Sequence, residues 1–302
     1  MCVAVFGGTG FVGSYIVDAL HEAGISTSLL ARDGDGGDER SRRVGGSIDD
    51  EAAIRRTLQG CDAVMYLIGI LRAFPKQGIT FEAMQYEGVV RVADIARELG
   101  ISRFLLMSAN GVEARQTPYQ ITKHDAERYV ADAGFDVTVL RPSVVFGDPR
   151  GKMEFATQLY QDMVRPPIPA VGFHTGLKPS SGVISMSPVH VEDVADAFVA
   201  ALNNPETIGQ TYELGGPEAV SWSDMIRRVA AAVGRSKIML PMPTGLMRIG
   251  ATLFDWLPFF PVTRDQLTML ELGNDCSPEP LKRLIGREPQ AFDETALAYL
   301  SN

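Results

Sequence analysis

Short apolar runs alternate with longer amphipathic ones along the first half of the chain. Cys2–Phe6 and Ser26–Ala31 are predicted as strands, and residues 11–23 between them have apolar side chains at helical spacing. The alternation continues along the chain. Further strands are predicted from residue 44 and over 63–68, 103–107 and 136–140, and further helices over 49–58, over 81–99 and from residue 117. This alternation predicts an α/β fold with a parallel, doubly wound sheet, which binds ligands beyond the carboxyl ends of its strands.

The pattern becomes less regular after Asp148. A proline-rich connection occupies 165–169, and a polar loop occupies 172–182, where His174 and Lys178 are candidate binding residues but are more typical of solvated loop positions. Helices are predicted over 191–202, from a cap at Ser221 through 233, over 264–272 and over 291–300. We therefore expect a core formed by 1–147, with contributions from 183–215, and a smaller substrate region formed by 148–302.

An unusually apolar stretch follows the loop region. Residues 244–256 have the pattern of an amphipathic helix, and 257–262 read Leu-Pro-Phe-Phe-Pro-Val. Three interpretations remain open: a lid over an apolar substrate pocket, a patch for a membrane or partner, and core packing of the smaller region.

The first strand breaks into a glycine-rich turn that leads into the first helix. Gly7 allows a tight reversal, Gly10 allows backbone N–H groups to approach a phosphate, and Gly13 allows the helix to pack on the sheet. The positive amino end of the helix then favours an anion. The spacing Gly-x-x-Gly-x-x-Gly in this context predicts a site for a dinucleotide pyrophosphate, and Gly69, at the end of strand 63–68, is expected beside the same cofactor.

The residue after the second strand bears on the choice of dinucleotide. An acidic residue there hydrogen-bonds a ribose 2′-hydroxyl, whereas an arginine offers a bidentate partner for a 2′-phosphate. Arg32 occupies this place, with Arg42 or Arg43 as candidate second cations. We therefore predict NADP(H), while Asp33 keeps NAD(H) as the alternative.

Tyr119 and Lys123 are four residues apart on the helix that opens at Thr117, so their side chains share one face. An ammonium near a phenol stabilises the phenolate and lowers the tyrosine pKa, which suits proton transfer to or from a carbonyl oxygen. Because the helix follows a strand of the predicted sheet, the pair is expected on the ligand side, where the lysine can also reach the cofactor ribose.

Composition narrows the function classes. The chain has 302 residues, and its formal net charge of -9 argues against a nucleic-acid-binding surface. Its three cysteines stand singly without a Cys-x-x-Cys motif, so we predict neither a disulfide framework nor a zinc or other metal site. With no signal peptide and no apolar run of the ~18 residues that a membrane span needs, we expect a cytoplasmic protein.

Four motifs together resemble one family, the extended or atypical branch of the short-chain dehydrogenase/reductase superfamily. They are Gly7-Gly8-Thr9-Gly10-Phe11-Val12-Gly13, Tyr119-x-x-x-Lys123, Arg-Pro-Ser-Val-Val-Phe-Gly at 141–147 and Pro-Val-His-Val-Glu-Asp-Val-Ala at 188–195. The match spans nearly the whole chain. The segments 240–243 and 257–267 most resemble the group that contains the reductase-like accessory subunit of respiratory complex I and its free-standing bacterial relatives.

The resemblance implies a Rossmann-like core and a set of site residues. Tyr119 and Lys123 form the acid/base site, and Ser108 is the nearest match to the family's substrate-orienting hydroxyl, with Ala109 as the alternative alignment and Asn110 as a substitute donor. The family's adenine-contacting Asp-Ile or Asp-Leu pair corresponds here to Ser47-Ile48, so the aspartate is missing. The implied cofactor-binding residues are Gly7, Thr9, Gly10, Phe11, Val12, Gly13, Arg32, Ser47, Ile48, Gly69, Lys123, Pro142 and Val145.

These expectations lead to an NADP(H)-dependent oxidoreductase that moves hydride between nicotinamide and an apolar carbonyl or quinone-like substrate. One alternative is a non-catalytic NADP(H)-binding protein that serves as a structural, assembly or redox-sensing component of a larger complex. A third is a sugar-nucleotide epimerase or dehydratase, which the apolar late segment disfavours. We expect a small-molecule substrate, no nucleic acid, no transmembrane span, and peripheral contact with a membrane or a respiratory complex as an open alternative.

Overall fold

A computed structural model of the chain describes residues 1–176, 182–245 and 264–301. The chain divides into two compact units. Unit 1 comprises Met1–Pro142, Glu192–Glu213 and Arg283–Gly286, and unit 2 comprises Ser143–Val191, Leu214–Lys282 and Arg287–Asn302. Each unit buries a hydrophobic cluster of its own.

Unit 1 is built on an eight-stranded sheet in the order β12-β7-β6-β5-β1-β2-β4-β3. Neighbouring strands from β7 to β4 run parallel, whereas β3 is antiparallel to β4. The strands are β1 (Cys2–Phe6), β2 (Ser26–Ala31), β3 (Gly36–Gly37), β4 (Ser41–Gly45), β5 (Ala63–Tyr66), β6 (Arg103–Met107), β7 (Asp136–Pro142) and β12 (Gln210–Leu214). The central strands are almost completely buried, because they are covered on both faces.

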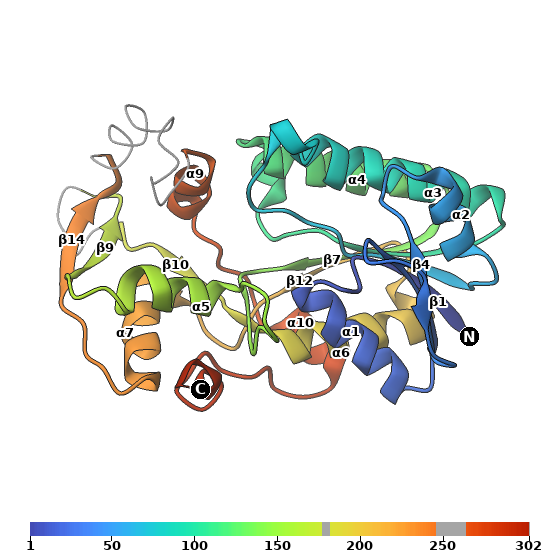
Figure 1. Cartoon of the computed structure of the whole chain (residues 1–302). Helices are drawn as coiled ribbons and strands as arrows, with labels where there is room; N and C mark the ends of the chain where they lie inside the picture. The colour runs from blue at the N-terminus through green and yellow to red at the C-terminus, as the bar shows by residue number, and fades with distance from the viewer. Residues whose placement is uncertain (177–181, 246–263, 302) are drawn as a thin grey trace. The chain divides into compact units, whose positions relative to one another are not determined.

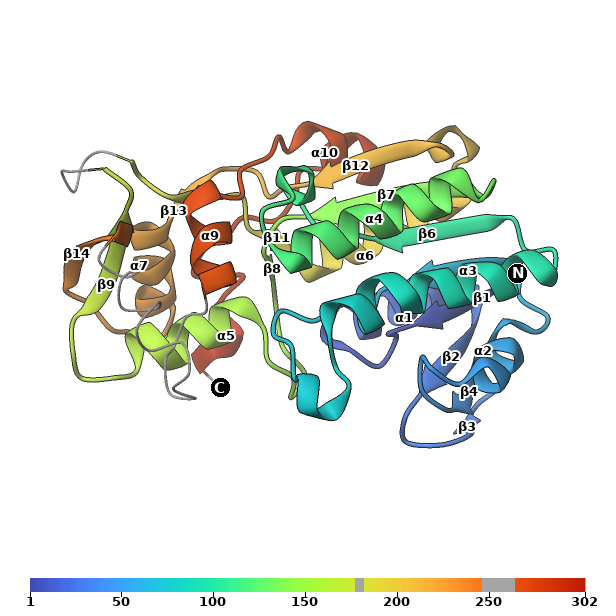
Figure 2. The same cartoon turned by 90° about the horizontal axis from the view of Figure 1, so that it is seen from above.

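Helices cover both faces of this sheet (Figures 1 and 2). One face carries α2 (Glu51–Leu58), α3 (Gly88–Glu98) and α4 (Pro118–Asp132), and the other carries α1 (Phe11–Glu22) and α6 (Val191–Asn203). This arrangement confirms the prediction of a Rossmann-like, doubly wound fold.

Unit 2 contains short strand pairs and helices. The strands are β8 (Val145–Phe146), β9 (Ala170–His174), β10 (Ser185–Met186), β11 (Val189–His190), β13 (Val220–Ser221) and β14 (Met239–Pro243), paired as β8 with β11, β9 with β14 and β10 with β13. The helices are α5 (Phe155–Leu159), the π-helical turn η4 (Tyr160–Val164), α7 (Trp222–Ala232), α9 (Arg264–Leu272) and the beginning of α10 (Glu279–Ile285), whose end from Arg283 belongs to unit 1. The Ser221 side chain accepts a hydrogen bond from the Asp224 N–H, which confirms the predicted cap of α7.

Several predicted boundaries were wrong. The polar loop after Ala31 contains β3, and the third long strand begins at Ser41 instead of Val44. The predicted helix over 81–99 starts with a π-helical segment, η2 (Glu82–Glu87). The predicted last helix over 291–300 is only a 3₁₀ turn, η6 (Ala298–Ser301), and α10 was not predicted.

The predicted amphipathic helix over 244–256 lies largely outside the described residues, and the apolar segment 257–262 lies entirely outside them. Within the described ranges, every helix is too short or too polar to cross a lipid bilayer.

Candidate functional site

The glycine-rich turn between β1 and α1 has a shape that side chains would block. Gly7 has φ of +95°, a conformation that favours glycine, and its carbonyl accepts the Gly10 N–H at 3.0 Å. A Cβ atom at Gly13 would lie 2.1 Å from the Gly7 carbonyl oxygen. The first turn of α1 therefore lies so close to the end of β1 that only glycine fits at position 13.

The amino end of α1 is open to an anion. Its cap residue is Gly10, which has no side chain to bond the N–H groups of the first turn, and no acidic residue stands in that turn. Thr9, Phe11 and Val12 are partly exposed around it, and Phe11 packs edge-on against Tyr15 with ring centroids 6.0 Å apart. The turn therefore fits the pyrophosphate of a dinucleotide.

Arg32 is exposed immediately after β2. Arg43 forms an ion pair with Asp33 at 3.5 Å, and both side chains are substantially exposed. The carboxylate that could favour NAD is thus already paired, although such surface pairs are weak.

Arg42 was a wrong candidate for a phosphate ligand. Its guanidinium donates to the Ser28 hydroxyl at 2.9 Å and to the backbone carbonyls of Arg56, Thr57 and Gln59 at 3.0, 3.2 and 2.9 Å. These contacts tie β2 and β4 to the end of α2, so the side chain has a structural role that its position in the sequence does not reveal.

Ser47 and Ile48 follow β4, where the adenine contact was expected. Ser47 is exposed, whereas Ile48 is buried and its carbonyl accepts a hydrogen bond from Arg91 Nη1 at 2.8 Å. At this place the chain offers an apolar side chain and a hydroxyl in place of the carboxylate that the family uses.

A capping box fixes the start of α4, which carries Tyr119 and Lys123. Thr117 accepts the Gln120 N–H, and Gln120 Oε1 accepts the Thr117 N–H at 3.2 Å. Gln120 Nε2 also donates to the Gly111 carbonyl at 2.9 Å, and Pro118 occupies the first turn. Tyr119 therefore stands on a rigid helical turn.

Lys123 brings three segments of unit 1 together. Its Nζ is buried and donates to the Met107 carbonyl, the last residue of β6, at 2.7 Å. A Cβ atom at Gly69 would lie 3.4 Å from the same Nζ, so the segment after β5 also passes beside it. Burial lowers the pKa of Lys123 to about 8, and the negative charge of Glu127 opposes this shift.

Tyr119 shows a pKa shift opposite to the one predicted. The ring is partly exposed and packs edge-on against Phe81, with centroids 5.9 Å apart. Burial of the phenol raises its pKa to about 12. The expected lowering by Lys123 does not appear, because desolvation of the phenolate dominates and the lysine ammonium bonds the Met107 carbonyl.

Ser108 directly follows β6 and is 3% exposed. Its backbone N–H donates to the Leu140 carbonyl at 2.8 Å, which holds the residue beside β7. Its Oγ is a buried side-chain oxygen that has no hydrogen-bond partner within the described part of the chain. A buried hydroxyl without a hydrogen-bond partner is unfavourable. The Ser108 hydroxyl is therefore suited to form a hydrogen bond with a ligand oxygen.

A backbone hydrogen bond fixes the loop that follows Ser108. The Asn110 N–H donates to the Pro142 carbonyl at 3.0 Å, so the loop after β6 is bonded to the end of β7. Val145 belongs to β8 of unit 2, where it pairs with Val189.

Two groups of residues beside α4 were not predicted. Gln85, in the π-helical segment η2, is 1% exposed; its Nε2 donates to the Ile70 carbonyl at 2.9 Å, and its Oε1 accepts from Thr122 at 3.1 Å. Arg141 forms a bidentate pair with Glu127, with donor–acceptor distances of 2.9 and 2.6 Å. Both support the helical turn of Lys123. Gln85 lies in none of the four motifs, and Arg141 opens the motif at 141–147, which assigned it no role.

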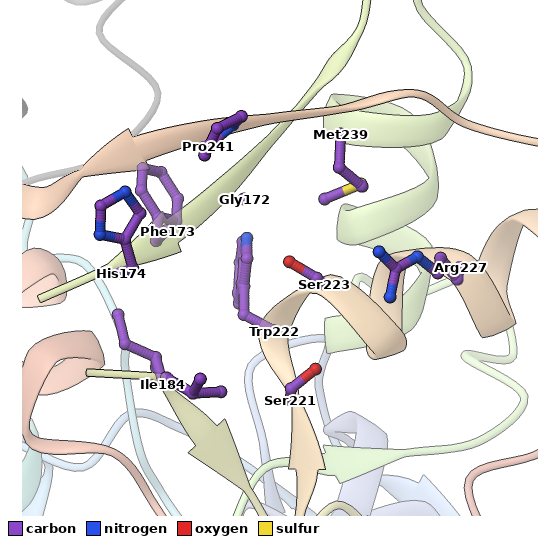
Figure 3. A pocket seen from close by; sticks show the side chains of 11 residues that line it. Gly172, Phe173, His174, Ile184, Ser221, Trp222, Ser223, Arg227, Met239 and Pro241 are labelled. Atoms are coloured by element: carbon purple, nitrogen blue, oxygen red, sulfur yellow. The ribbon is translucent and has the colours of Figure 1, made fainter. Parts of the chain in front are cut away.

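Unit 2 contains a separate pocket of about 330 Å³ (Figure 3). Apolar side chains make up much of its wall, and Phe173 and Trp222 meet with ring centroids 5.5 Å apart. Ser223 and Arg227 from α7 supply polar groups beside them. The full lining is Gly172, Phe173, His174, Val183, Ile184, Ser221, Trp222, Ser223, Arg227, Met239 and Pro241.

His174 was wrongly expected as a solvated loop residue. It closes β9, is 4% exposed, and its Nδ1 lies 2.9 Å from the Gly176 carbonyl. It therefore forms part of the pocket wall. Lys178, the other candidate in this loop, lies outside the described residues.

Comparison with known proteins gives a family and several relatives. The model of the NAD dependent epimerase/dehydratase family matches residues 3–215. The chain is 25% identical over 311 residues to the mitochondrial NADH dehydrogenase (ubiquinone) 1 alpha subcomplex subunit 9 of Mus musculus, with 98% of this chain and 78% of that protein covered. It is 27% identical over 262 residues to the ceramide reductase of Caulobacter vibrioides, with 84% and 78% covered.

Among solved structures, the UDP-glucose 4-epimerase of Thermus thermophilus in complex with NAD superposes with a TM-score of 0.74 at 18% identity, covering 100% of this chain and 98% of that one. At this identity the likeness shows the fold alone. Together, the family match and the relatives confirm the resemblance that the four motifs predicted and the likeness to the complex I accessory subunit that the segments 240–243 and 257–267 predicted.

Proposed function

Because the chain belongs to the NAD dependent epimerase/dehydratase family, we propose that it is an NADP(H)-dependent oxidoreductase acting on an apolar carbonyl or quinone-like substrate. The observation that carries the proposal is the pair of buried polar groups at the end of β6. Ser108 Oγ has no partner within the described residues, and Lys123 Nζ bonds the carbonyl of the adjacent Met107. A buried hydroxyl without a protein partner is unfavourable unless a ligand or a water bonds it, so it fits a site that binds an oxygen atom.

The glycine turn and Arg32 would hold the dinucleotide. The turn supplies a helix amino end that a Cβ atom at Gly13 would obstruct, and Arg32 supplies an exposed guanidinium beyond β2. When bound, the nicotinamide dinucleotide supplies or accepts a hydride. The chain itself has to bind the reacting oxygen and move a proton.

Proton transfer would fall to Tyr119. A phenol whose pKa is about 12 remains protonated at neutral pH, so it is prepared to donate a proton to a carbonyl oxygen that gains negative charge. Ser108 would donate a hydrogen bond to the same oxygen. Lys123, with a pKa of about 8, is mostly charged at neutral pH and would stabilise the phenolate that remains after the transfer.

The pocket of unit 2 has the size of a small-molecule site. Its volume of about 330 Å³ lies within the range of such sites, and aromatic and aliphatic side chains line it together with polar ones. We propose that unit 2 binds a small molecule of mixed polarity in this pocket.

Replacing Tyr119 with phenylalanine tests the proposed activity. Turnover of NADPH with a panel of quinones, long-chain aldehydes and ketones is expected to fall about 10²- to 10⁴-fold, because general acid catalysis is lost. NADPH affinity is expected to stay within about twofold, since the phenol does not belong to the phosphate-binding turn. Tyr129→Phe removes a phenol from the same helix and should leave turnover unchanged. Equal turnover in Tyr119→Phe and wild type would overturn the proposal.

Replacing Arg32 with alanine tests the cofactor preference. The guanidinium is expected to contribute mainly to a 2′-phosphate, so NADPH should bind at least about tenfold more weakly while NADH affinity changes little. Titration of both dinucleotides into wild type and variant measures this difference. Equal losses for the two would contradict the NADP(H) preference.

A second candidate is a non-catalytic NADP(H)-binding component of a larger assembly. The observation that favours it is the likeness over 98% of the chain to a protein named as an NADH dehydrogenase subunit. Under this alternative, the purified protein retains a dinucleotide that mass spectrometry identifies, yet shows no turnover with the panel above. Including nucleotide sugars in the panel tests the epimerase alternative at the same time.

A further inference from the structure

Two cysteines that are far apart in the sequence meet in unit 1. Cys2 opens β1, and Cys61 lies between α2 and β5, yet their sulfur atoms are 3.3 Å apart. Both are free thiols. A disulfide bond is about 2.05 Å long, so the sulfur atoms need to approach each other by only about 1 Å to be joined.

The backbone holds the two cysteines side by side. The Asp62 N–H donates to the Cys2 carbonyl at 2.8 Å, and the Cys2 N–H donates to Asp62 Oδ2 at 2.7 Å. The Cys61 N–H donates to the Leu58 carbonyl at 3.0 Å. Because these bonds fix both main chains, side-chain rotation is the motion that remains available to bring the sulfur atoms together.

The two thiols have opposite acidities. A hydrogen bond with Cys61 lowers the pKa of Cys2 to about 7, and the positive charge of Arg42 acts in the same direction, against burial and the negative charge of Asp62. The hydrogen bond with Cys2, together with burial, raises the pKa of Cys61. Cys2 therefore has the character of the nucleophile that reacts first. Cys61 has the character of the buried thiol that reacts with the oxidised Cys2.

The two cysteines also differ in solvent accessibility. Cys2 is half-buried, so a small oxidant can reach it, whereas Cys61 is 9% exposed. Within the described residues, no group of three or more histidine, cysteine or acidic side chains is arranged to hold a metal ion. The pair therefore has the features of a redox-active dithiol and lacks those of a metal site.

We propose that Cys2 and Cys61 form a peroxide-sensitive dithiol that closes to an intramolecular disulfide. The Cys2 thiolate attacks a peroxide oxygen, the O–O bond breaks, and hydroxide or alkoxide leaves, which gives a sulfenic acid on Cys2. The Cys61 sulfur then attacks the Cys2 sulfur and loses its proton, and water leaves as the S–S bond forms. Two thiols are oxidised by two electrons, and one peroxide is reduced.

The disulfide would connect β1 with the segment that enters β5, a neighbouring strand of the sheet. It would close a loop between residues 59 positions apart, which restricts the unfolded chain and favours the folded one. β1 continues directly into the glycine turn, so oxidation would stiffen the strand that supports this turn. This inference does not depend on the proposed oxidoreductase activity.

Peptide mapping of the full chain tests the proposal. Reduced protein is treated with one equivalent of hydrogen peroxide, blocked with N-ethylmaleimide and digested with trypsin, which separates Cys2, Cys61 and Cys276 into peptides 1–32, 57–72 and 265–282. The expected product is peptide 1–32 linked to 57–72, about 2 Da lighter than the sum of the two. An unlinked pair, with both thiols alkylated after peroxide, would overturn the proposal.

Single substitutions separate the two roles. Cys61→Ser should trap a dimedone-reactive sulfenic acid on Cys2, Cys2→Ser should abolish the link, and Cys276→Ser should behave like wild type. At pH 7 and low iodoacetamide concentration, Cys2 should be alkylated at least about tenfold faster than Cys276, because more of it is thiolate. Equal alkylation rates, or sulfenic acid on Cys276 alone, would contradict the assigned roles. Thermal unfolding of each variant verifies that the fold is retained.

Discussion

The two parts of the candidate site in unit 1 are specified in different ways. At the glycine turn, backbone geometry is the determinant: Gly7 has positive φ, and Gly13 lies so close to the Gly7 carbonyl that a methyl group has no room. At the end of β6, side chains and burial are the determinants: Ser108 Oγ is unpaired within the described residues, and the pKa values of Tyr119 and Lys123 are shifted by desolvation.

This difference predicts opposite effects of substitution on stability. The turn is a well-packed part of the fold, so a larger residue there should destabilise it. At the end of β6, the polar groups of Ser108 and Lys123 are held in an unfavourable environment, so their removal should stabilise the fold, and under the proposed function activity should be lost. Three substitutions test this contrast in order of decreasing effect.

The largest effect is expected for Gly13→Ala. The new Cβ atom would lie 2.1 Å from a backbone oxygen, so the turn or α1 has to shift. We expect the free energy of unfolding to fall by about 3 kcal/mol and dinucleotide binding to be lost. Urea unfolding and NADPH titration measure the two effects. Gly245→Ala is the control, because a Cβ atom there meets no atom of the described residues within 4 Å.

An intermediate effect of opposite sign is expected for Lys123→Met. Burial lowers the pKa of this lysine from 10.5 to about 8, which costs the fold about 3 kcal/mol at neutral pH. The hydrogen bond to Met107 returns about 1 kcal/mol of this. The variant should therefore be about 2 kcal/mol more stable than wild type at pH 7.

The pH dependence gives this prediction a second test. Between pH 8 and 10.5 the unfolded lysine binds a proton that the folded one has lost, so wild-type stability should rise with pH across this window. The advantage of Lys123→Met should shrink correspondingly. Lys76→Met, a change at an exposed lysine, should show neither effect. An unchanged advantage from pH 7 to 10.5 would contradict the burial cost.

The smallest effect is expected for Ser108→Ala. Removal of an unpaired buried hydroxyl should raise the free energy of unfolding by about 1 kcal/mol. Ser28→Ala is the matched control, since Ser28 is also buried but accepts hydrogen bonds from Arg42 at 3.1 and 2.9 Å. Loss of the Ser28 hydroxyl should destabilise the fold by a similar amount. If both variants are destabilised, Ser108 has a structural partner and is not poised for a ligand.

The sequence predicted what depends on local pattern. The strand Arg103–Met107 and the start of α1 at Phe11 follow directly from apolar spacing and glycine positions. β3 was missed because Gly36 and Gly37 have no side chains to mark a strand, and their pairing with β4 is set by contacts along the sheet edge. The prediction of a last helix over 291–300 was wrong: the composition of this segment is typical of a helix, but the structure forms only a 3₁₀ turn at its end.

The sequence predicted which residues share one face of α4 but not their electrostatics. Spacing places Tyr119 and Lys123 on one face of α4, yet the sign of the tyrosine pKa shift depends on how deeply the phenol is buried, which no local pattern encodes. Likewise, Arg42 is one of two adjacent arginines on β4. Only the position of the α2 carbonyls shows that Arg42 is the arginine that bonds them and is not available to a phosphate. The meeting of Cys2 and Cys61 depends on strand order and was equally invisible.

The π-helical segment η2 has a consequence for insertions and deletions. A π-helical turn accommodates one residue more than an α-helical one, and Gln85 within it reaches both Ile70 and Thr122. Deletion of a single residue between Glu82 and Glu87 would remove this extra residue, and the regular α-helical turn that results would keep the flanking segments in phase. Phe81 would then keep its contact with the ring of Tyr119, whereas Gln85 would lose its position between Ile70 and Thr122. The extra residue of this turn is therefore a constraint on the contacts of Gln85.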